Sequence, residues 1–282
     1  MKAFNITIIN DEISETLSET IRFLKLHQIN FVELRTIKKK NMINYSLPEV
    51  RDFYTQLTDS NIKVSALASP LFKWYPHNTV HAHVETTDTF GFSPFLNTNE
   101  KKDYIEKTID VAKALRTERI RIFSSLKEPQ GRYSFIDDKL FLYALDRARE
   151  EKVVLLLENE PPCYVSRMTD LKSIASQFVS QNFGIWFDIA NFYKIREHVT
   201  LEDLEELKGS IQYFHLKDFD ASGNYVPLGQ GIVNYKQLIS YIQKVFNNKS
   251  IFLSIETHAQ NKPEEITLLS LQTLKILLSE ET

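Results

Sequence analysis

The sequence predicts a (β/α)8 barrel, an α/β fold, formed as a single domain by residues 1–282. Short apolar runs typical of buried parallel strands alternate eight times with stretches whose apolar residues have helical spacing. No linker or change of composition divides these units, and eight of them in about 280 residues is a usual size for such a barrel. A doubly wound open sheet is the alternative, but its first turn is usually rich in glycine. Here Asn10-Asp11-Glu12 follows the first strand, so the barrel is the better prediction.

The first three units begin with apolar runs whose ends are recognisable. Lys2–Ile9 is the first expected strand, and Ser14 is the expected N-cap of the helix that follows it. Phe31–Leu34 is the second strand, and the helix after it opens near a proline. Ile62–Ala68 is the third strand, and we expect Ser69-Pro70 to end it.

Residues 70–97 interrupt this alternation. They hold three prolines, three histidines and six aromatic residues without a clear period. Long loops in compact domains are usually functional or disordered, and the aromatic content argues against disorder. We therefore expect a lid-like insertion over one end of the barrel.

The alternation resumes after the insertion and continues to the end of the chain. The remaining expected strands are Arg119–Ser124, Val153–Leu157, Phe183–Phe187, Ile211–Leu216 and Ile251–Ile255. The expected helices beside them cover residues 104–115, 136–150, 168–181, 201–207, 235–246 and 264–278.

Composition and charge exclude several classes of protein. Lys and Arg number 34 against 37 Asp and Glu, and this slightly acidic balance lacks the basic excess typical of nucleic-acid binders. No apolar run approaches the roughly 20 residues of a membrane span, and we see no signal peptide. The single cysteine, Cys163, suits a reducing compartment, so we expect a cytoplasmic protein. The sequence leaves a homo-oligomer open.

Polar residues follow the expected strands at their carboxyl ends. In a (β/α)8 barrel all these ends face one rim, where active sites lie. Arg121 alternates with Ile120 and Ile122, which predicts that its side chain points into the barrel mouth. The polar residues at the rim are Glu33, Arg35, Ser69, Lys73, Arg121, Ser124, Glu158, Glu160, Asp188, Asn191, His215, Lys217, Asp218, Glu256 and His258.

The last four strands end in three carboxylates and one imidazole, those of Glu158, Asp188, His215 and Glu256. Oxygen ligands with one nitrogen suit Mn²⁺, Mg²⁺ or Co²⁺, and Zn²⁺ is also compatible. We therefore predict that these residues bind one divalent cation. The alternative is a salt-bridged rim, in which the acids are balanced by Lys73, Arg35, Arg121 and Lys217.

Eight short motifs carry a family resemblance, in the same order along nearly the whole chain. They are Phe31-Val32-Glu33-Leu34-Arg35, Ala68-Ser69-Pro70-Leu71-Phe72-Lys73, Ile120-Arg121-Ile122-Phe123-Ser124, Glu158-Asn159-Glu160, Phe187-Asp188-Ile189-Ala190-Asn191-Phe192, His215-Leu216-Lys217-Asp218, Gly229-Gln230-Gly231 and Ile255-Glu256-Thr257-His258. With these motifs the chain resembles the sugar phosphate isomerase/epimerase group of xylose-isomerase-like barrels. That group includes ketose 3-epimerases, inosose dehydratases and, more distantly, endonuclease IV.

The resemblance implies a metal-dependent isomerase or epimerase of a small sugar or sugar phosphate. It assigns the metal to the same four strand-end residues. The cation would bind adjacent sugar oxygens and stabilise an enediolate, while Glu158 and Glu256 remove and return the proton from opposite faces. We expect the substrate to be contacted by Lys73, Arg35, Arg121, Glu160, Asn191, Lys217 and His258.

Two departures from the family pattern limit what the resemblance implies. Asn191 stands where endonuclease IV has a histidine, which disfavours its trinuclear DNA-repair chemistry. Gln230 replaces the glutamate of the usual Gly-Glu-Gly loop. Two other functions stay open: a lyase of the inosose dehydratase kind, in which the same site expels a hydroxyl, and a barrel that binds a metal or sugar without turnover.

Overall fold

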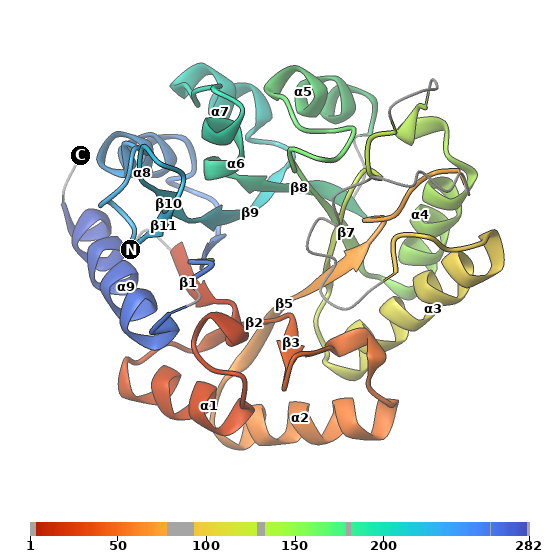
Figure 1. Ribbon diagram of the computed structural model, residues 1–282, viewed down its shortest axis with the longest axis horizontal. Coiled ribbons are helices and arrows are strands. Elements are labelled where there is room, and N and C mark those ends of the chain that lie inside the picture. Colours follow the sequence, from red (N-terminus) through yellow and green to blue (C-terminus); the bar gives the residue numbers. More distant parts are fainter. Residues whose placement is uncertain (1–3, 78–92, 129–132, 179–181, 260, 281–282) are drawn as a thin grey trace.

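The protein is described by a computed structural model over residues 4–77, 93–128, 133–178, 182–259 and 261–280. Its main sheet consists of eight parallel strands in the order β1-β12-β9-β8-β7-β6-β5-β2. In Figure 1 this sheet curls into a nearly closed barrel in the middle of the view, and the helices lie around its outside. The predicted (β/α)8 barrel is confirmed.

Each strand of the barrel is followed by helical structure. The barrel strands are β1 (Phe4–Ile8), β2 (Phe31–Leu34), β5 (Lys63–Leu71), β6 (Arg119–Ile122), β7 (Val154–Glu158), β8 (Phe183–Asp188), β9 (Ile211–Leu216) and β12 (Ile251–Ile255). The α-helices are α1 (Leu17–Leu26), α2 (Leu47–Asp59), α3 (Thr98–Ala114), α4 (Lys139–Glu151), α5 (Met168–Gln177), α6 (Ile189–Lys194), α7 (Leu201–Leu207), α8 (Tyr235–Val245) and α9 (Pro263–Ser279). In the described part of the chain, no helix is long and apolar enough to cross a membrane.

Two small hairpins extend the rim of the barrel. The first follows β2 and pairs β3 (Thr36–Ile37) with β4 (Lys40–Asn41). The second follows β9 and pairs β10 (Asp218–Phe219) with β11 (Tyr225–Val226). Both hairpins therefore lie at the carboxyl ends of strands, where the sequence places the site.

Side chains alternate between the two faces of each strand, and this alternation positions the site. In β7, Leu155 and Leu157 belong to the main core between sheet and helices, whereas Leu156 belongs to a separate cluster inside the barrel. Glu158 lies two residues after Leu156, so its side chain also faces the interior, nearer the rim. The other members of the interior cluster are Ala66, Trp186, Tyr213 and Phe252.

The barrel closes at a seam between β1 and β2. A single parallel bridge joins Ile9 and Glu33 there. The side chain of Asn10 adds two hydrogen bonds, accepting one from N of Arg35 at 2.9 Å and donating one to O of Thr36 at 2.5 Å. At this seam, one bridge and the hydrogen bonds of Asn10 join the strands, whereas the other neighbouring strands are joined by longer series of backbone pairings.

The structure corrects three local predictions. The N-cap of α1 is Thr16, whose side chain accepts a hydrogen bond from N of Glu19, and not Ser14. Strand β5 continues through Ser69-Pro70 to Leu71, because its pairing with β6 is irregular there and does not need the missing N–H of proline. Helix α6 is additional, and it begins directly after β8 with Asp188 as its N-cap.

The predicted insertion at residues 70–97 is only partly described. Residues 70–71 belong to β5, and residues 78–92 lie outside the described residues. The lid therefore stays a prediction.

The loop after β11 is fixed by one buried carboxylate. Asp218 accepts hydrogen bonds from the backbone N–H groups of Gly229, Gly231 and Val233 at 3.0, 2.9 and 3.2 Å. A Cβ atom at Gly231 would overlap with this carboxylate and with the carbonyl oxygen of Phe219. Glycine is therefore required at position 231 for the loop to close on Asp218.

We expect Gly231→Ala to lower the free energy of unfolding by about 1–3 kcal/mol, as overpacking of a filled site usually does. The midpoint of urea unfolding measures this change. Gly209→Ala is the matched control, because a Cβ atom there meets open space, and its effect should stay within about 0.5 kcal/mol. Equal midpoints for the two variants would contradict the packing argument.

Candidate active site and metal centre

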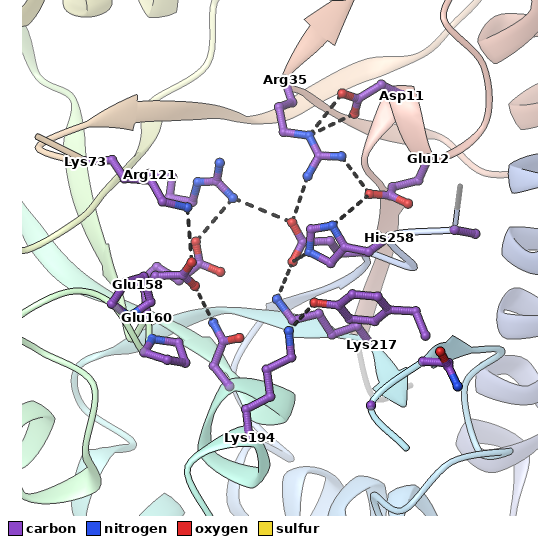
Figure 2. Close-up of a pocket in the computed structure, with 18 of the residues that line it drawn as sticks. Asp11, Glu12, Arg35, Lys73, Arg121, Glu158, Glu160, Lys194, Lys217 and His258 are labelled. Carbon is purple, nitrogen blue, oxygen red and sulfur yellow. Dashed lines mark hydrogen bonds and ion pairs between the residues drawn. The ribbon is translucent and has the colours of Figure 1, made fainter. Parts of the chain in front are cut away.

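The carboxyl ends of the barrel strands surround a cavity of about 910 Å³, shown in Figure 2. Two of the four predicted metal ligands, Glu158 and Glu256, line this cavity. The other two, Asp188 and His215, are fully buried behind its wall. All the predicted substrate contacts line it as well: Arg35, Lys73, Arg121, Glu160, Asn191, Lys217 and His258.

The four predicted ligands lie close together. Each offers one ligand atom, and these atoms lie within 4.8 Å of one another. Nδ1 of His215 is 3.0 Å from Glu158, 3.2 Å from Glu256 and 3.9 Å from Asp188. The carboxylates of Glu33, Glu256 and Glu158 outweigh the effect of burial and raise the pKa of His215 well above its usual value. The arrangement provides three oxygen ligands and one nitrogen around a common centre.

Three cations also reach this group. Nζ of Lys217 lies 2.6 Å from Asp188 and 2.8 Å from Glu256. Arg121 lies 3.2 Å from Glu158 and 3.8 Å from Glu256. Arg35 lies 2.9 Å from Glu256. The salt bridges considered as the alternative to a metal are therefore present.

These cations do not balance the acids around them. Among the described residues, the ion-paired cluster contains three Lys or Arg side chains, from Arg35, Arg121 and Lys217. It contains six carboxylates, from Asp11, Glu12, Glu33, Glu158, Asp188 and Glu256. The raised pKa of His215 adds a fourth positive charge, so six carboxylates still face four cations, and this negative excess favours binding of a divalent cation.

The two glutamates of the cavity wall are held in the carboxylate form. Burial raises the pKa of a carboxyl group, but Arg121 and His215 outweigh it at Glu158 and lower its pKa to about 2. Lys217 and His215 likewise hold the pKa of Glu256 well below its usual range. Both side chains are therefore available as ligands and as bases near neutral pH.

Asp188 has the properties of an unsatisfied ligand. Burial raises its pKa to about 6 in spite of the nearby Lys217. Its Oδ2 forms an ion pair with Nζ of Lys217 at 2.6 Å, but this oxygen accepts no hydrogen bond from a described residue. A cation bound at Oδ2 would add to the stabilisation that the ion pair with Lys217 gives this buried carboxylate. The residues present therefore fit a divalent metal.

Three predicted substrate contacts form a separate polar group on the cavity wall. Nζ of Lys73 lies 3.1 Å from Oε1 of Glu160 and 4.7 Å from the centre of the Phe123 ring. Asn191 donates a hydrogen bond to Oε2 of Glu160 at 2.8 Å. This group lies beside the four proposed ligands and can hold polar parts of a bound molecule.

His258 lies beside Glu256, on the side of the cavity away from Lys73 (Figure 2). Its backbone has φ of 51°, a left-handed conformation, which turns the chain directly after β12. Its Nε2 then lies 3.4 Å from Glu256, its Nδ1 lies 3.9 Å from Glu12, and its ring lies 4.8 Å from that of Tyr225.

The cavity is also lined by residues that the sequence did not predict, among them Asp11, Glu12, Lys194 and Tyr225. Asp11 and Glu12 follow β1 and hold Arg35, so the rule used for the other strand ends would have found them. Lys194, at the end of α6, contacts the hydroxyl group of Tyr225 on β11. Figure 2 shows Lys194 directed into the cavity. Lys194 and Tyr225 do not follow a predicted strand, because they belong to α6 and β11, which the sequence does not predict.

Comparisons with known proteins identify the family and the fold. The family model described as xylose isomerase-like TIM barrel matches residues 21–277. No curated protein matches the chain. Among solved structures, the IolI protein with a bound zinc atom is 17% identical with a TM-score of 0.73, and the match covers 98% of each chain.

Two further solved structures are similarly distant. The probable 3-DHS dehydratase AsbF of Bacillus anthracis is 15% identical with a TM-score of 0.71, over 96% of this chain and 99% of that one. D-allulose 3-epimerase from Methylomonas sp. in complex with D-allulose is 12% identical with a TM-score of 0.70, over 98% of each chain. At these identities the likeness concerns the fold.

Proposed function

Because the chain belongs to the xylose isomerase-like TIM barrel family, we propose that it is a metal-dependent isomerase or epimerase of a small sugar or sugar phosphate. The resemblance read from the sequence motifs is thereby confirmed at the level of the family. The observation that carries the proposal is the division of the four ligand residues. Glu158 and Glu256 line the cavity, whereas Asp188 and His215 lie behind it.

This division supports two roles for the glutamates. All four residues would hold the cation, but Glu158 and Glu256 alone among them would also face a substrate. When bound, the cation would polarise a substrate carbonyl and stabilise the enediolate charge that forms on proton removal. Glu158 and Glu256 would remove the proton from one face of the substrate and return it on the other. Their lowered pKa values keep both side chains deprotonated near neutral pH, the form that can accept a proton.

The arginines at the cavity wall support proton transfer by these two groups. Arg121 lies 3.2 Å from Glu158 and 3.8 Å from Glu256, so its charge stabilises whichever carboxylate is deprotonated. Arg35 stabilises Glu256 from the other side at 2.9 Å. The cavity of about 910 Å³ has the size of a small-molecule site. Two of the similar folds, with bound zinc in one and D-allulose in the other, support a metal and a sugar as the ligands here.

Solvent isotope exchange with a metal-reconstituted protein tests the proposal. We expect chelation to abolish exchange of deuterium from D₂O into a panel of ketoses, and added Mn²⁺ to restore it, because the proton on the carbon next to the carbonyl becomes acidic only beside the cation. NMR detects the exchanged position and the product. A protein that neither retains nor rebinds a divalent cation would contradict the proposal.

The same experiment separates the other two functions. A lyase would give net loss of water without an epimerised or isomerised product. A binding protein would take up Mn²⁺ without catalysing exchange into any sugar of the panel.

A further inference from the structure

Glu33 is a buried carboxylate that the proposed chemistry does not use. It lies on β2 inside the barrel, its side chain has no exposed surface, and it does not line the cavity. Three side chains direct polar hydrogens at its oxygens. Nε2 of His215 lies 3.0 Å from both oxygens, the hydroxyl of Tyr213 lies 3.1 Å from Oε2, and the hydroxyl of Ser254 lies 2.5 Å from Oε2.

These contacts belong to a larger network inside the barrel, which we call the Glu33 network. The hydroxyl of Tyr213 also lies 2.9 Å from that of Ser65, which in turn lies 2.9 Å from that of Thr7. The members come from β1, β2, β5, β9 and β12, and they are Thr7, Glu33, Ser65, Tyr213 and Ser254. A buried carboxylate is unfavourable unless its charge and hydrogen bonds are satisfied. Residues on five strands therefore act together to hold the carboxylate of Glu33 in place.

The two nitrogens of His215 face different partners. Nδ1 faces the other three proposed ligands, at 3.0 Å from Glu158, 3.2 Å from Glu256 and 3.9 Å from Asp188. Nε2, on the opposite side of the ring, faces Glu33. A histidine ligand needs a lone pair on the nitrogen that binds the metal, and an acceptor at the other nitrogen selects the tautomer that provides it.

We propose that Glu33 is a positioning residue that holds the proton of His215 on Nε2 and so directs the lone pair of Nδ1 into the metal group. The inference rests on the proposed metal site. The side chain of Trp186 assists, because its ring meets that of His215 edge to face at 4.9 Å and 81° and limits rotation of the imidazole. The Glu33 network then fixes a metal ligand from below the cavity, out of reach of the substrate.

Metal affinity and the state of the imidazole test this role. We expect Glu33→Gln to weaken Mn²⁺ binding by about 10–100-fold in calorimetric titration, the usual effect of losing such an outer partner. The amide keeps the size of the side chain and an acceptor oxygen but loses the charge. Tyr213→Phe and Ser254→Ala each remove one hydrogen bond from Glu33 and keep its carboxylate. They are matched controls and should weaken binding less than Glu33→Gln.

The ¹⁵N shifts of His215 provide a readout that a purely structural role would not change. In the Zn²⁺-loaded wild type we expect a metal-bound Nδ1 and a protonated Nε2. The Nε2–H signal should broaden or shift in Glu33→Gln, with the His215→Gln protein used for assignment. If Nε2 of His215 binds the metal in the wild type, the inference is wrong. This outcome needs only the wild type, so it can be measured even if no Glu33 variant folds.

The remaining outcomes distinguish this inference from the proposed function. The inference fails, and the proposed function stands, if the wild type binds Mn²⁺ and the Glu33→Gln variant binds it equally well with unchanged ¹⁵N shifts of His215. A wild type that binds no divalent cation overturns both.

Discussion

Glu158→Gln is expected to abolish measurable Mn²⁺ binding and to lower turnover by roughly 10²–10⁴-fold, the range attributed to a general acid or base. The amide is a weaker ligand than the carboxylate and cannot accept the substrate proton. It keeps the shape of the side chain, and its oxygen can still accept a hydrogen bond from Arg121, which lies 3.2 Å from Glu158. Equilibrium dialysis with Mn²⁺ and steady-state kinetics on a ketose that exchanges its proton measure the two effects.

Glu160→Gln is the matched control for this substitution. Glu160 lies two residues further along the same segment and lines the same cavity, but its partners are Lys73 and Asn191 and not the metal group. The Glu160→Gln variant should bind Mn²⁺ with an affinity similar to that of the wild type, while its KM for the ketose rises. Loss of Mn²⁺ binding in both variants, or in neither, would show that the ligands are assigned to the wrong residues.

Lys217→Met is expected to destabilise the chelator-treated protein by about 3–5 kcal/mol, because it leaves Asp188 and Glu256 without their closest cation in a buried site. For a chain of this size the melting temperature should fall by roughly 6–20 °C. Added Mn²⁺ should restore much of the loss, since it replaces the missing positive charge. The variant should also bind Mn²⁺ more tightly than the wild type, because Lys217 no longer repels the ion. Calorimetry measures both effects.

Lys194→Met controls for the loss of a lysine from the same cavity. Its side chain is exposed and has no ion-pair partner among the described residues, so its stability should change by no more than about 0.5 kcal/mol. If Lys217→Met instead loses its affinity for Mn²⁺, the lysine supports the metal site and does not compete with it.

The fold was predictable because apolar strands and amphipathic helices have different periods. The run Val153–Leu157 predicted β7 (Val154–Glu158) to within one residue at each end, since a strand buried on both faces needs apolar residues throughout. Elements that depend on a single turn were not predictable. Helix α6 begins at a cap formed by Asp188, a proposed ligand, whose side chain accepts a hydrogen bond from N of Asn191. Proline in Ser69-Pro70 suggested a strand end, but the irregular pairing of β5 accommodates it.

The candidate site was predictable where its residues end a strand. The rule that all carboxyl ends share one rim predicts that Glu158, Asp188, His215 and Glu256 lie close together, and in the structure they do. The rule gives the place of a residue but not its partners. It grouped Glu33 with the rim, whereas the structure places this carboxylate inside the barrel against Nε2 of His215. Contacts between residues 182 positions apart depend on the packed barrel and leave no local pattern in the sequence.

The long distances in sequence between Glu33 and its partners have a consequence for when the proposed metal would bind during synthesis. Glu33 belongs to the early part of the chain, yet its partners His215 and Ser254 follow 182 and 221 residues later. A ribosome-bound chain that lacks β12 has neither Ser254 nor the last proposed ligand, Glu256. On this assignment, metal uptake is delayed until the last strand has joined the first, and a bound ion marks a barrel that has finished folding.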